Sequence, residues 1–253
     1  MELYGLVGYP LGHSFSAKIH ENWFAQKGIE ARYVNFEIED LSQLSAQVFC
    51  NKNLRGFNVT APFKEKIISM LDEIDSEAEH VGAVNVVKIL EDGKLKGFNT
   101  DVYGFRESLR ETLSTETLLS ALVLGTGGAA KAVECALRSY GTEVTFVTRN
   151  KKEKASFFAG RCLEYGELNE EMMNKFDLIV NATPSGTYPK VDICPSIPYT
   201  GLSERHICFD LVYNPAETLF LSKCRSQGAT TINGMRMLEL QAERSRQIWL
   251  DRN

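Results

Sequence analysis

The sequence predicts an α/β protein with two domains, one built on a mixed sheet and the other on a parallel sheet. Short apolar runs alternate with stretches of helical periodicity along almost the whole chain, which is typical of α/β folds. A hairpin turn interrupts this alternation in the first half, and a glycine-rich loop follows a strand in the second half. The hairpin indicates a mixed sheet, and the glycine-rich loop indicates a strand-helix-strand unit.

The composition is that of a globular protein. The 253 residues include 28 Lys and Arg against 33 Asp and Glu, so the net charge of -5 comes from a near-balanced surface. Extended non-specific binding to nucleic acid is therefore not expected. Apolar runs fall short of the roughly 18 residues of a membrane span, and the first residues lack a secretory signal. With six scattered cysteines and no Cys-x-x-Cys pair, we expect a cytoplasmic protein with reduced thiols and no membrane partner.

The first hundred residues predict strands alternating with helices, followed by a hairpin. Ser16 is a suitable N-cap for the first helix, and Gly28 is a suitable residue to end it. Asp92-Gly93 predicts the turn of the hairpin. The predicted strands are 3–8, 33–38, 56–60, 83–90 and 94–98, and the predicted helices are 17–26, 41–49 and 64–71.

An amphipathic helix beginning near Thr100 is predicted to connect the two halves. Phe105, Leu109 and Leu113 recur at a spacing of four residues, which is the helical period. A strand, a helix and a second strand then predict a βαβ unit. The predicted strands of this half are 121–124, 143–147, 177–181, 207–210 and 230–232, and its helices are 129–140, 217–226 and 235–250.

A glycine-rich loop joins the first strand and helix of that unit. The run Gly125-Thr126-Gly127-Gly128-Ala129-Ala130 matches the Gly-x-Gly-x-x-Gly/Ala dinucleotide fingerprint. Gly125 would permit the tight turn, and Gly127 would let the backbone approach a pyrophosphate at the helix N-terminus. The motif in this context favours dinucleotide binding over an ordinary glycine-rich turn.

The end of the following strand bears on the choice of cofactor. An NAD site usually places an acidic residue there, about 20 residues past the glycines, but this sequence has Thr148-Arg149-Asn150. The Arg149 guanidinium can pair bidentately with a 2′-phosphate, and Lys151 and Lys152 could add positive charge. NADP is therefore the predicted cofactor, with a solvated basic turn as the alternative.

Polar residues follow the third predicted strand. Asn58 and Thr60 stand at its carboxyl end, where open α/β sheets bind ligands, and Lys64 falls in the predicted first turn of a helix. A helix dipole disfavours a lysine there, so Lys64 is either functional or a surface lysine with an extended stem.

Two further polar groups have equally open interpretations. Ser14 and Ser16 could contact a ligand or cap a helix, and the same holds for Thr100 and Asp101. The four histidines have no metal-ligand spacing, so no metal site is expected. No Gly-x-Ser-x-Gly elbow is present, which argues against acyl transfer.

Taken in order, these motifs resemble those of the shikimate dehydrogenase family over nearly the whole chain. The motifs that carry the resemblance are Ser14-Phe15-Ser16, Asn58-Val59-Thr60-Ala61-Pro62-Phe63-Lys64, Gly82-Ala83-Val84-Asn85, Asn99-Thr100-Asp101, the loop 125–130, Asn181-Ala182-Thr183-Pro184, Asp210-Leu211-Val212-Tyr213-Asn214-Pro215, Gly234-Met235-Arg236-Met237-Leu238 and Gln241.

The resemblance implies two α/β domains that face a cleft. The substrate-binding domain would be 1–101, completed by the C-terminal helix 234–253, and the Rossmann-like NADP domain would be 102–233. The implied activity is the NADPH-dependent reduction of 3-dehydroshikimate to shikimate, a step towards aromatic amino acids, by a monomer or homodimer.

Two alternatives remain open at this stage. One is an NAD-dependent quinate/shikimate dehydrogenase, which Arg149 disfavours. The other is a catalytically silent paralogue that binds NADP or a shikimate-like acid, which the presence of both Lys64 and Asp101 disfavours.

The resemblance also implies a role for each matched residue. Lys64 and Asp101 would be the catalytic pair. The implied substrate ligands are Ser14, Ser16 and Tyr213 for the carboxylate, and Asn58, Thr60, Asn85 and Gln241 for the ring hydroxyls. The implied cofactor ligands are Gly125, Gly127, Gly128, Ala129, Thr148, Arg149, Thr183 and Gly234. Val86, Thr148 and Thr187 depart from the residues usual in the family, and we expect them to affect affinity more than activity.

Overall fold

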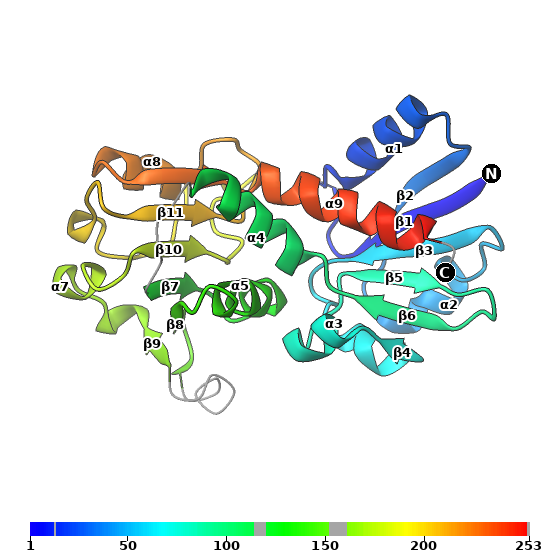
Figure 1. Cartoon of the computed structure of the whole chain (residues 1–253), viewed down its shortest axis with the longest axis horizontal. Helices are drawn as coiled ribbons and strands as arrows, with labels where there is room; N and C mark the ends of the chain where they lie inside the picture. Colours follow the sequence, from blue (N-terminus) through cyan, green and yellow to red (C-terminus); the bar gives the residue numbers. More distant parts are fainter. Residues whose placement is uncertain (13, 114–119, 152–160, 252–253) are drawn as a thin grey trace. The chain divides into compact units, whose positions relative to one another are not determined.

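The computed structural model describes residues 1–12, 14–113, 120–151 and 161–251. The chain divides into two compact units (Figure 1). Unit 1 comprises Met1–Gly104 and Glu239–Asn253, and unit 2 comprises Phe105–Leu238. No helix in the described part of the chain is both long and apolar enough to span a membrane.

Unit 1 is built on a six-stranded mixed sheet. Its strands are β1 (Glu2–Gly8), β2 (Ala31–Glu37), β3 (Leu54–Val59), β4 (Glu73–Ile74), β5 (Val86–Ile89) and β6 (Leu95–Phe98), in the order β2-β1-β3-β5-β6-β4. The first three strands are parallel. β5 and β6 form the predicted antiparallel hairpin, in which Gly93 has a φ of 86°.

The first and last helices of unit 1 are long, and the helices between them in the sequence are short. In chain order, the helices are α1 (Ser16–Lys27), η1 (Leu41–Gln43), α2 (Leu44–Gln47), η2 (Lys66–Met70), α3 (Ser76–Val81) and most of α9 (Met235–Leu250). As predicted, α1 ends at Gly28, whose φ of 65° is left-handed.

Two local predictions in unit 1 are wrong. Ser16 does not cap α1 but is its first residue, because a turn from Leu11 to Ser14 places the Ser14 hydroxyl ahead of the helix. Ser14 Oγ accepts the Ser16 N–H at 3.2 Å. The helix expected from Lys64 begins only at Lys66 and is a 3₁₀ helix, because the Lys64 carbonyl accepts the Val84 N–H at 2.8 Å instead.

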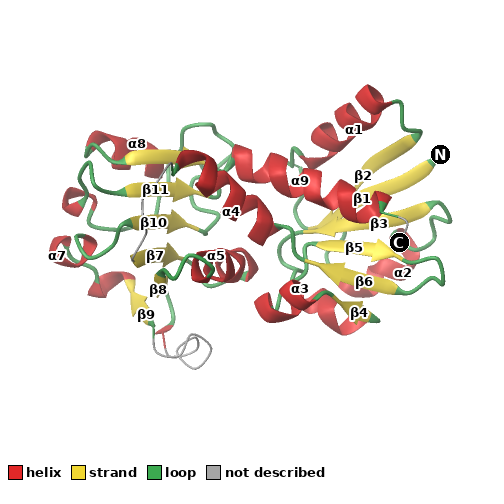
Figure 2. Cartoon of the chain, viewed as in Figure 1, coloured by secondary structure: helices red, strands yellow, loops and turns green. Residues whose placement is uncertain are grey.

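The sheet of unit 1 is apolar on both faces. Val7 of β1 packs in a cluster with side chains of α2, η2 and α3, whereas Tyr4 and Leu6 point to the opposite face, which α1 and α9 cover (Figure 2). The Trp249 ring of α9 stacks on Tyr4 with centroids 4.9 Å apart, and its Nε1 donates to Val87 O at 3.0 Å. These contacts attach the C-terminal helix to unit 1.

A buried histidine on α1, His20, makes the free energy of unfolding depend on pH. His20 is 1% exposed, and its ring stacks on Tyr33 at 4.3 Å. Burial, and then the charge of Arg246, lower the pKa of His20 to about 3 from its ordinary value of 6.5. The folded state therefore binds fewer protons than the unfolded state between these values, so the free energy of unfolding should fall as the pH drops through this window.

We expect this histidine to lower the free energy of unfolding by about 2 kcal/mol between pH 7 and pH 5, at 1.36 kcal/mol per pKa unit. Urea unfolding of the parent and of His20→Phe at both pH values measures it. The variant should lose less stability on acidification, and His80→Gln, at an exposed position, should behave as the parent. An equal loss in the parent and in His20→Phe would contradict the assignment.

Unit 2 is built on a six-stranded parallel sheet. Its strands are β7 (Ser120–Leu124), β8 (Glu143–Thr148), β9 (Cys162–Glu164), β10 (Leu178–Asn181), β11 (Ile207–Asp210) and β12 (Thr230–Asn233). The helices in its described residues are α4 (Asp101–Thr112, which begins in unit 1), α5 (Gly128–Arg138), η3 (Tyr165–Glu167), α7 (Glu170–Met173), η4 (Tyr199–Gly201) and α8 (Leu219–Ser226).

The glycine-rich loop of unit 2 follows β7, the strand at which the strand order changes direction. The order is β12-β11-β10-β7-β8-β9, and every pair is parallel. Successive strands run outward from β7 to one side and from β10 to the other, and ligands bind at such a switch point in doubly wound sheets. The predicted βαβ unit is confirmed as β7, α5 and β8, and the predicted fold class is confirmed with it.

Candidate functional site

The centre of the polar group in unit 1 is an ion pair. Lys64 Nζ donates to Asp101 Oδ2 at 2.6 Å, and the two side chains are 18% and 3% exposed. Lys64 lies in the turn after β3, and Asp101 is the first residue of α4. Asn99 caps this helix, since its Oδ1 accepts the N–H of Asp101 at 3.0 Å. Of the two interpretations left open for Thr100 and Asp101, capping is therefore not needed, and the Asp101 carboxylate is available for Lys64.

The second carboxylate oxygen of Asp101 is held by Asn85. Asn85 Nδ2 donates to Asp101 Oδ1 at 2.9 Å and also lies 3.0 Å from Gln241 Oε1. Asn85 Oδ1 accepts the Thr100 N–H at 2.7 Å, which fixes the orientation of the amide because a backbone N–H can only donate. The structure therefore brings four predicted site residues together, from the turn after β3, the bend before β5, α4 and α9.

Asn58, at the carboxyl end of β3, belongs to the same network. Its Nδ2 donates to Asn85 O at 3.1 Å and to Ser245 Oγ at 3.0 Å. Its Oδ1 accepts the Tyr33 hydroxyl at 2.8 Å. Asn58 is 8% exposed, so most of its polar surface faces these protein partners.

The remaining predicted residues of unit 1 are half-buried. Thr60 follows β3, and Ser14 and Ser16 stand at the start of α1. Within the described part of the chain, the hydroxyls of Thr60 and Ser16 have no hydrogen-bond partner, whereas Ser14 Oγ holds the Ser16 N–H. The carboxyl ends of β1 and β3 therefore carry hydroxyl groups that could bind a ligand.

The glycine loop of unit 2 has the geometry that close approach of a ligand requires. Gly125 has a φ of 108°, and a Cβ there would lie 3.1 Å from Ala182 O, so a larger residue would be strained. A Cβ on Gly127 would meet nothing within 4 Å among the described residues, and Gly127 has no side chain to cap α5. The first turn of α5, which contains Gly128 and Ala129, can therefore offer its N–H groups to an anion.

Arg149 follows β8 and is exposed. Its guanidinium has no hydrogen-bond or ion-pair partner among the residues that the structure describes, although its charge acts on Tyr165. Thr148 is buried, and its Oγ1 accepts the Asn150 N–H at 3.3 Å. Lys152, which the sequence suggested as a further cation, lies outside the described residues.

The loop after β10 is held by a buried polar network. Thr183 Oγ1 donates to Asn181 Oδ1 at 2.6 Å, and Asn181 Nδ2 donates to Asp210 Oδ1 at 2.9 Å. Thr218 Oγ1 donates to the other oxygen of Asp210 at 2.5 Å. Burial nevertheless raises the pKa of Asp210 to about 6. This network holds Thr183 next to the glycine loop, where Ala182 approaches Gly125.

Two predicted residues stand elsewhere in unit 2. Tyr213 lies in the loop after β11, and Gly234 lies between β12 and α9. A Cβ on Gly234 would collide with the Leu211 carbonyl oxygen, so glycine is required there by packing of the backbone, whatever it binds. The described residues contain no group of three or more His, Cys, Asp or Glu side chains suited to a metal ion.

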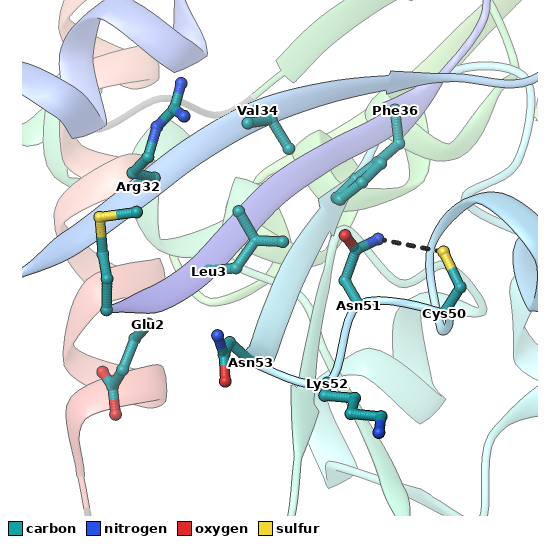
Figure 3. A pocket seen from close by; sticks show the side chains of 10 residues that line it. Glu2, Leu3, Arg32, Val34, Phe36, Cys50, Asn51, Lys52 and Asn53 are labelled. Atoms are coloured by element: carbon teal, nitrogen blue, oxygen red, sulfur yellow. Dashed lines mark hydrogen bonds between the residues drawn. The ribbon is translucent and has the colours of Figure 1, made fainter.

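A pocket of about 500 Å³ in unit 1 contains none of the predicted site residues. It lies over β1, β2 and the turn that precedes β3, with Leu3, Val34 and Phe36 pointing into it and Arg32 and Lys52 at its rim (Figure 3). The predicted residues of β3 stand at the opposite, carboxyl end of that strand. The pocket and the polar network are thus separate features.

Sequence reasoning assigned no role in the site to Tyr33, Ser245 or Asn99. Ser245 follows Gln241 by four residues on α9, so the helical period already placed it on the same face. Asn99 directly precedes a predicted helix and is a residue type that favours the N-cap. No local pattern connects Tyr33 with Asn58, which lies 25 residues further along the chain.

Comparisons with known proteins agree with one another. The family model for the shikimate dehydrogenase substrate binding domain matches residues 6–87. The chain is similar to a shikimate dehydrogenase (NADP(+)) of Methanococcus maripaludis, with 40% identity over 98% of this chain and 91% of the relative.

Solved structures extend the likeness to the whole fold. A shikimate 5-dehydrogenase of Thermus thermophilus, in complex with NADP(H) and shikimate, has a TM-score of 0.86 and 33% identity over 99% of this chain and 94% of that chain. A quinate dehydrogenase of Corynebacterium glutamicum, in complex with NAD, also has a TM-score of 0.86, with 28% identity over 98% of this chain and 93% of that chain.

Proposed function

This chain belongs to the shikimate dehydrogenase family, and from its two sites we infer that it reduces 3-dehydroshikimate to shikimate with NADPH. The reaction is a reversible hydride transfer and a step towards aromatic amino acids. The main observation behind the proposal is the ion pair between Lys64 and Asp101, in which the second carboxylate oxygen of Asp101 accepts a hydrogen bond from Asn85. It holds a proton-bearing cation in a network of polar groups suited to a polyhydroxylated acid.

The chemistry of ketone reduction suits this pair. Bound NADPH supplies the hydride. As the carbonyl carbon is reduced, negative charge grows on its oxygen, and the ammonium of Lys64 can stabilise that charge and donate a proton. Asp101 would orient the ammonium through Oδ2. Asn85 would keep the carboxylate in place through Oδ1.

We assign substrate contacts to the polar residues of unit 1 and to one residue of unit 2. Ser14 and Ser16, assisted by Tyr213, would hold the substrate carboxylate. The ring hydroxyls would bind to Asn58, Thr60, Asn85 and Gln241. Direct contact between the Asn85 and Gln241 side chains at 3.0 Å supports the second set.

We assign cofactor contacts to unit 2. The uncapped start of α5 supports a pyrophosphate site at Gly125, Gly127, Gly128 and Ala129. Arg149 would bind the 2′-phosphate beside Thr148, and Thr183 and Gly234 would line the rest of the site. The open space above Gly127 fits an anionic cofactor, and so does the Arg149 guanidinium, which lacks an ion-pair partner within the described ranges.

The two alternative functions are not favoured. An NAD enzyme would be expected to carry an acidic residue at the end of β8, where Arg149 stands. A silent binding protein has no need of a proton donor, yet Lys64 is held at 2.6 Å from Asp101.

The proposal includes domain roles and surroundings. Residues 1–101 with 234–253 would form the substrate-binding domain, and residues 102–233 the NADP domain. The enzyme would act in the cytoplasm as a monomer or homodimer. The six cysteines, all of them free thiols, are consistent with a reducing compartment.

A steady-state assay tests the function. Shikimate with NADP should be oxidised with a kcat/KM at least about tenfold above that with NAD, since one charge-assisted contact separates the two cofactors. Quinate with either cofactor serves as the comparison. Equal or better use of quinate with NAD would favour the quinate/shikimate alternative, and a lack of turnover with any pair would favour the silent paralogue.

A further inference from the structure

The Asn58 amide has almost all of its hydrogen-bonding capacity satisfied inside the protein. A side-chain amide offers two N–H donors and two acceptor positions on its oxygen. Both donors are used, on Asn85 O and Ser245 Oγ, and one acceptor position is used by the Tyr33 hydroxyl. One lone pair on Oδ1 is the capacity that remains for a ligand.

The chemistry of the partners fixes which way the amide faces. A backbone carbonyl can only accept, so the atom facing Asn85 O must be Nδ2. Ser245 donates its own hydroxyl proton to Gln241 O at 2.8 Å, so it receives an N–H from Asn58. Tyr33 must then be the donor to Oδ1.

Both partners of the amide are rigidly placed. Tyr33 is 3% exposed and stacks on His20 with an interplanar angle of 4°. Ser245 is fully buried on α9, one helical turn after Gln241, and its Oγ also lies 3.4 Å from Thr100 Oγ1. Thr100 Oγ1 in turn accepts from Asn85 at 3.1 Å. Ser245 thus joins the parts of the network that hold Asn58 and Asn85.

On the basis of the function proposed above, we propose that Tyr33 and Ser245 are positioning residues, which hold the Asn58 amide so that it meets substrate through Oδ1 alone. The substrate hydroxyl at this position must then donate its proton to Asn58. The site would select for a hydroxyl there, because an ether or a carbonyl oxygen has no proton to give.

Two single substitutions test the proposal by kinetics. Tyr33→Phe removes one hydroxyl and keeps the ring, and Ser245→Ala removes the acceptor of one amide proton. Each should raise the KM for shikimate about two- to tenfold, the range for loss of one neutral hydrogen bond, with the KM for NADP unchanged.

Matched controls separate positioning from packing. Tyr4→Phe removes a similarly buried hydroxyl from the same cluster, one that donates to Glu2 instead. Ser108→Ala removes a buried hydroxyl that lacks a partner among the described residues. Both controls should keep the parent KM values. If Tyr33→Phe and Ser245→Ala had the same KM for shikimate as the two controls, the positioning role would be wrong.

A measurement without turnover separates this proposal from the proposed function. In protein with ¹⁵N-labelled Asn side chains, the Asn58 NH₂ signals, assigned by their absence in Asn58→Asp, should exchange slowly with solvent. Ser245→Ala should speed exchange of one of the two protons at least about tenfold, the effect of losing one hydrogen bond, and added shikimate should leave both slow in the parent. Fast exchange in the parent, or no change in Ser245→Ala, overturns the positioning role. A parent that shows slow exchange but neither binds nor oxidises shikimate refutes the proposed function instead.

Discussion

Replacing Lys64 with alanine should lower turnover by at least two orders of magnitude while the KM for NADP stays near the parent value. General acid catalysis is typically worth about 10²–10⁴-fold, and the ammonium acts on charge that develops only in the transition state. Its position 2.6 Å from Asp101 Oδ2 means that the group is already oriented before the reaction begins. Steady-state kinetics of shikimate oxidation measures the effect, with circular dichroism to verify folding.

Several variants make this result specific. Lys64→Met fills more of the space, in case the loss of a partner for the buried Asp101 carboxylate unfolds Lys64→Ala. Lys64→Arg should not restore turnover, because a guanidinium does not release a proton at neutral pH. Lys66→Ala removes an exposed lysine two residues away and should be nearly silent. A folded Lys64→Ala that kept more than about a tenth of parent turnover would show that Lys64 is at most a binding residue.

The second large effect is expected at the cofactor. Arg149→Ala should raise the KM for NADP by roughly one to two orders of magnitude, as expected for loss of one charge-assisted contact worth about 1.5–3 kcal/mol. Because NAD lacks the 2′-phosphate, its KM should change little. The exposed guanidinium has no ion-pair partner within the described ranges, so its removal breaks no salt bridge there.

The control for Arg149 is a lysine in the same unit. Lys175→Ala removes one exposed positive charge before β10, at the amino ends of the strands, and should leave both cofactor KM values unchanged. Initial rates with each cofactor at saturating shikimate provide the comparison. An unchanged KM for NADP in Arg149→Ala would show that Arg149 belongs to a solvated basic turn and does not bind the 2′-phosphate.

The fold could be predicted where local pattern and tertiary structure agree. The strand, glycine loop and helix around Gly125 were predicted closely, because the tight turn and the helical period are written in adjacent residues. The helix predicted to begin at Lys64 does not begin there, because the Val84 N–H donates to the Lys64 carbonyl. The two-residue strand β4 was missed because it exists through pairing with β6.

The candidate site shows the same limit more strongly. The family resemblance implied Lys64 and Asp101 as a pair, and the structure joins them across 37 residues. The bond from Asn58 to Ser245 spans 187 residues, so no periodicity could reveal it. The functional roles of all these residues remain predictions that the variants above test.

The attachment of α9 to unit 1 has a consequence for biosynthesis on the ribosome. Residues 1–104 emerge first, but the helix that carries Gln241, Ser245 and Trp249 emerges only after residues 105–238 have been made. At about 5–20 residues per second, that interval is on the order of ten seconds. During it, the face of Tyr4 that Trp249 later covers stays exposed to chaperones, because unit 1 lacks its last helix until unit 2 has been made. The apolar face of unit 1 that α9 covers should therefore be among the last parts of the chain to be buried.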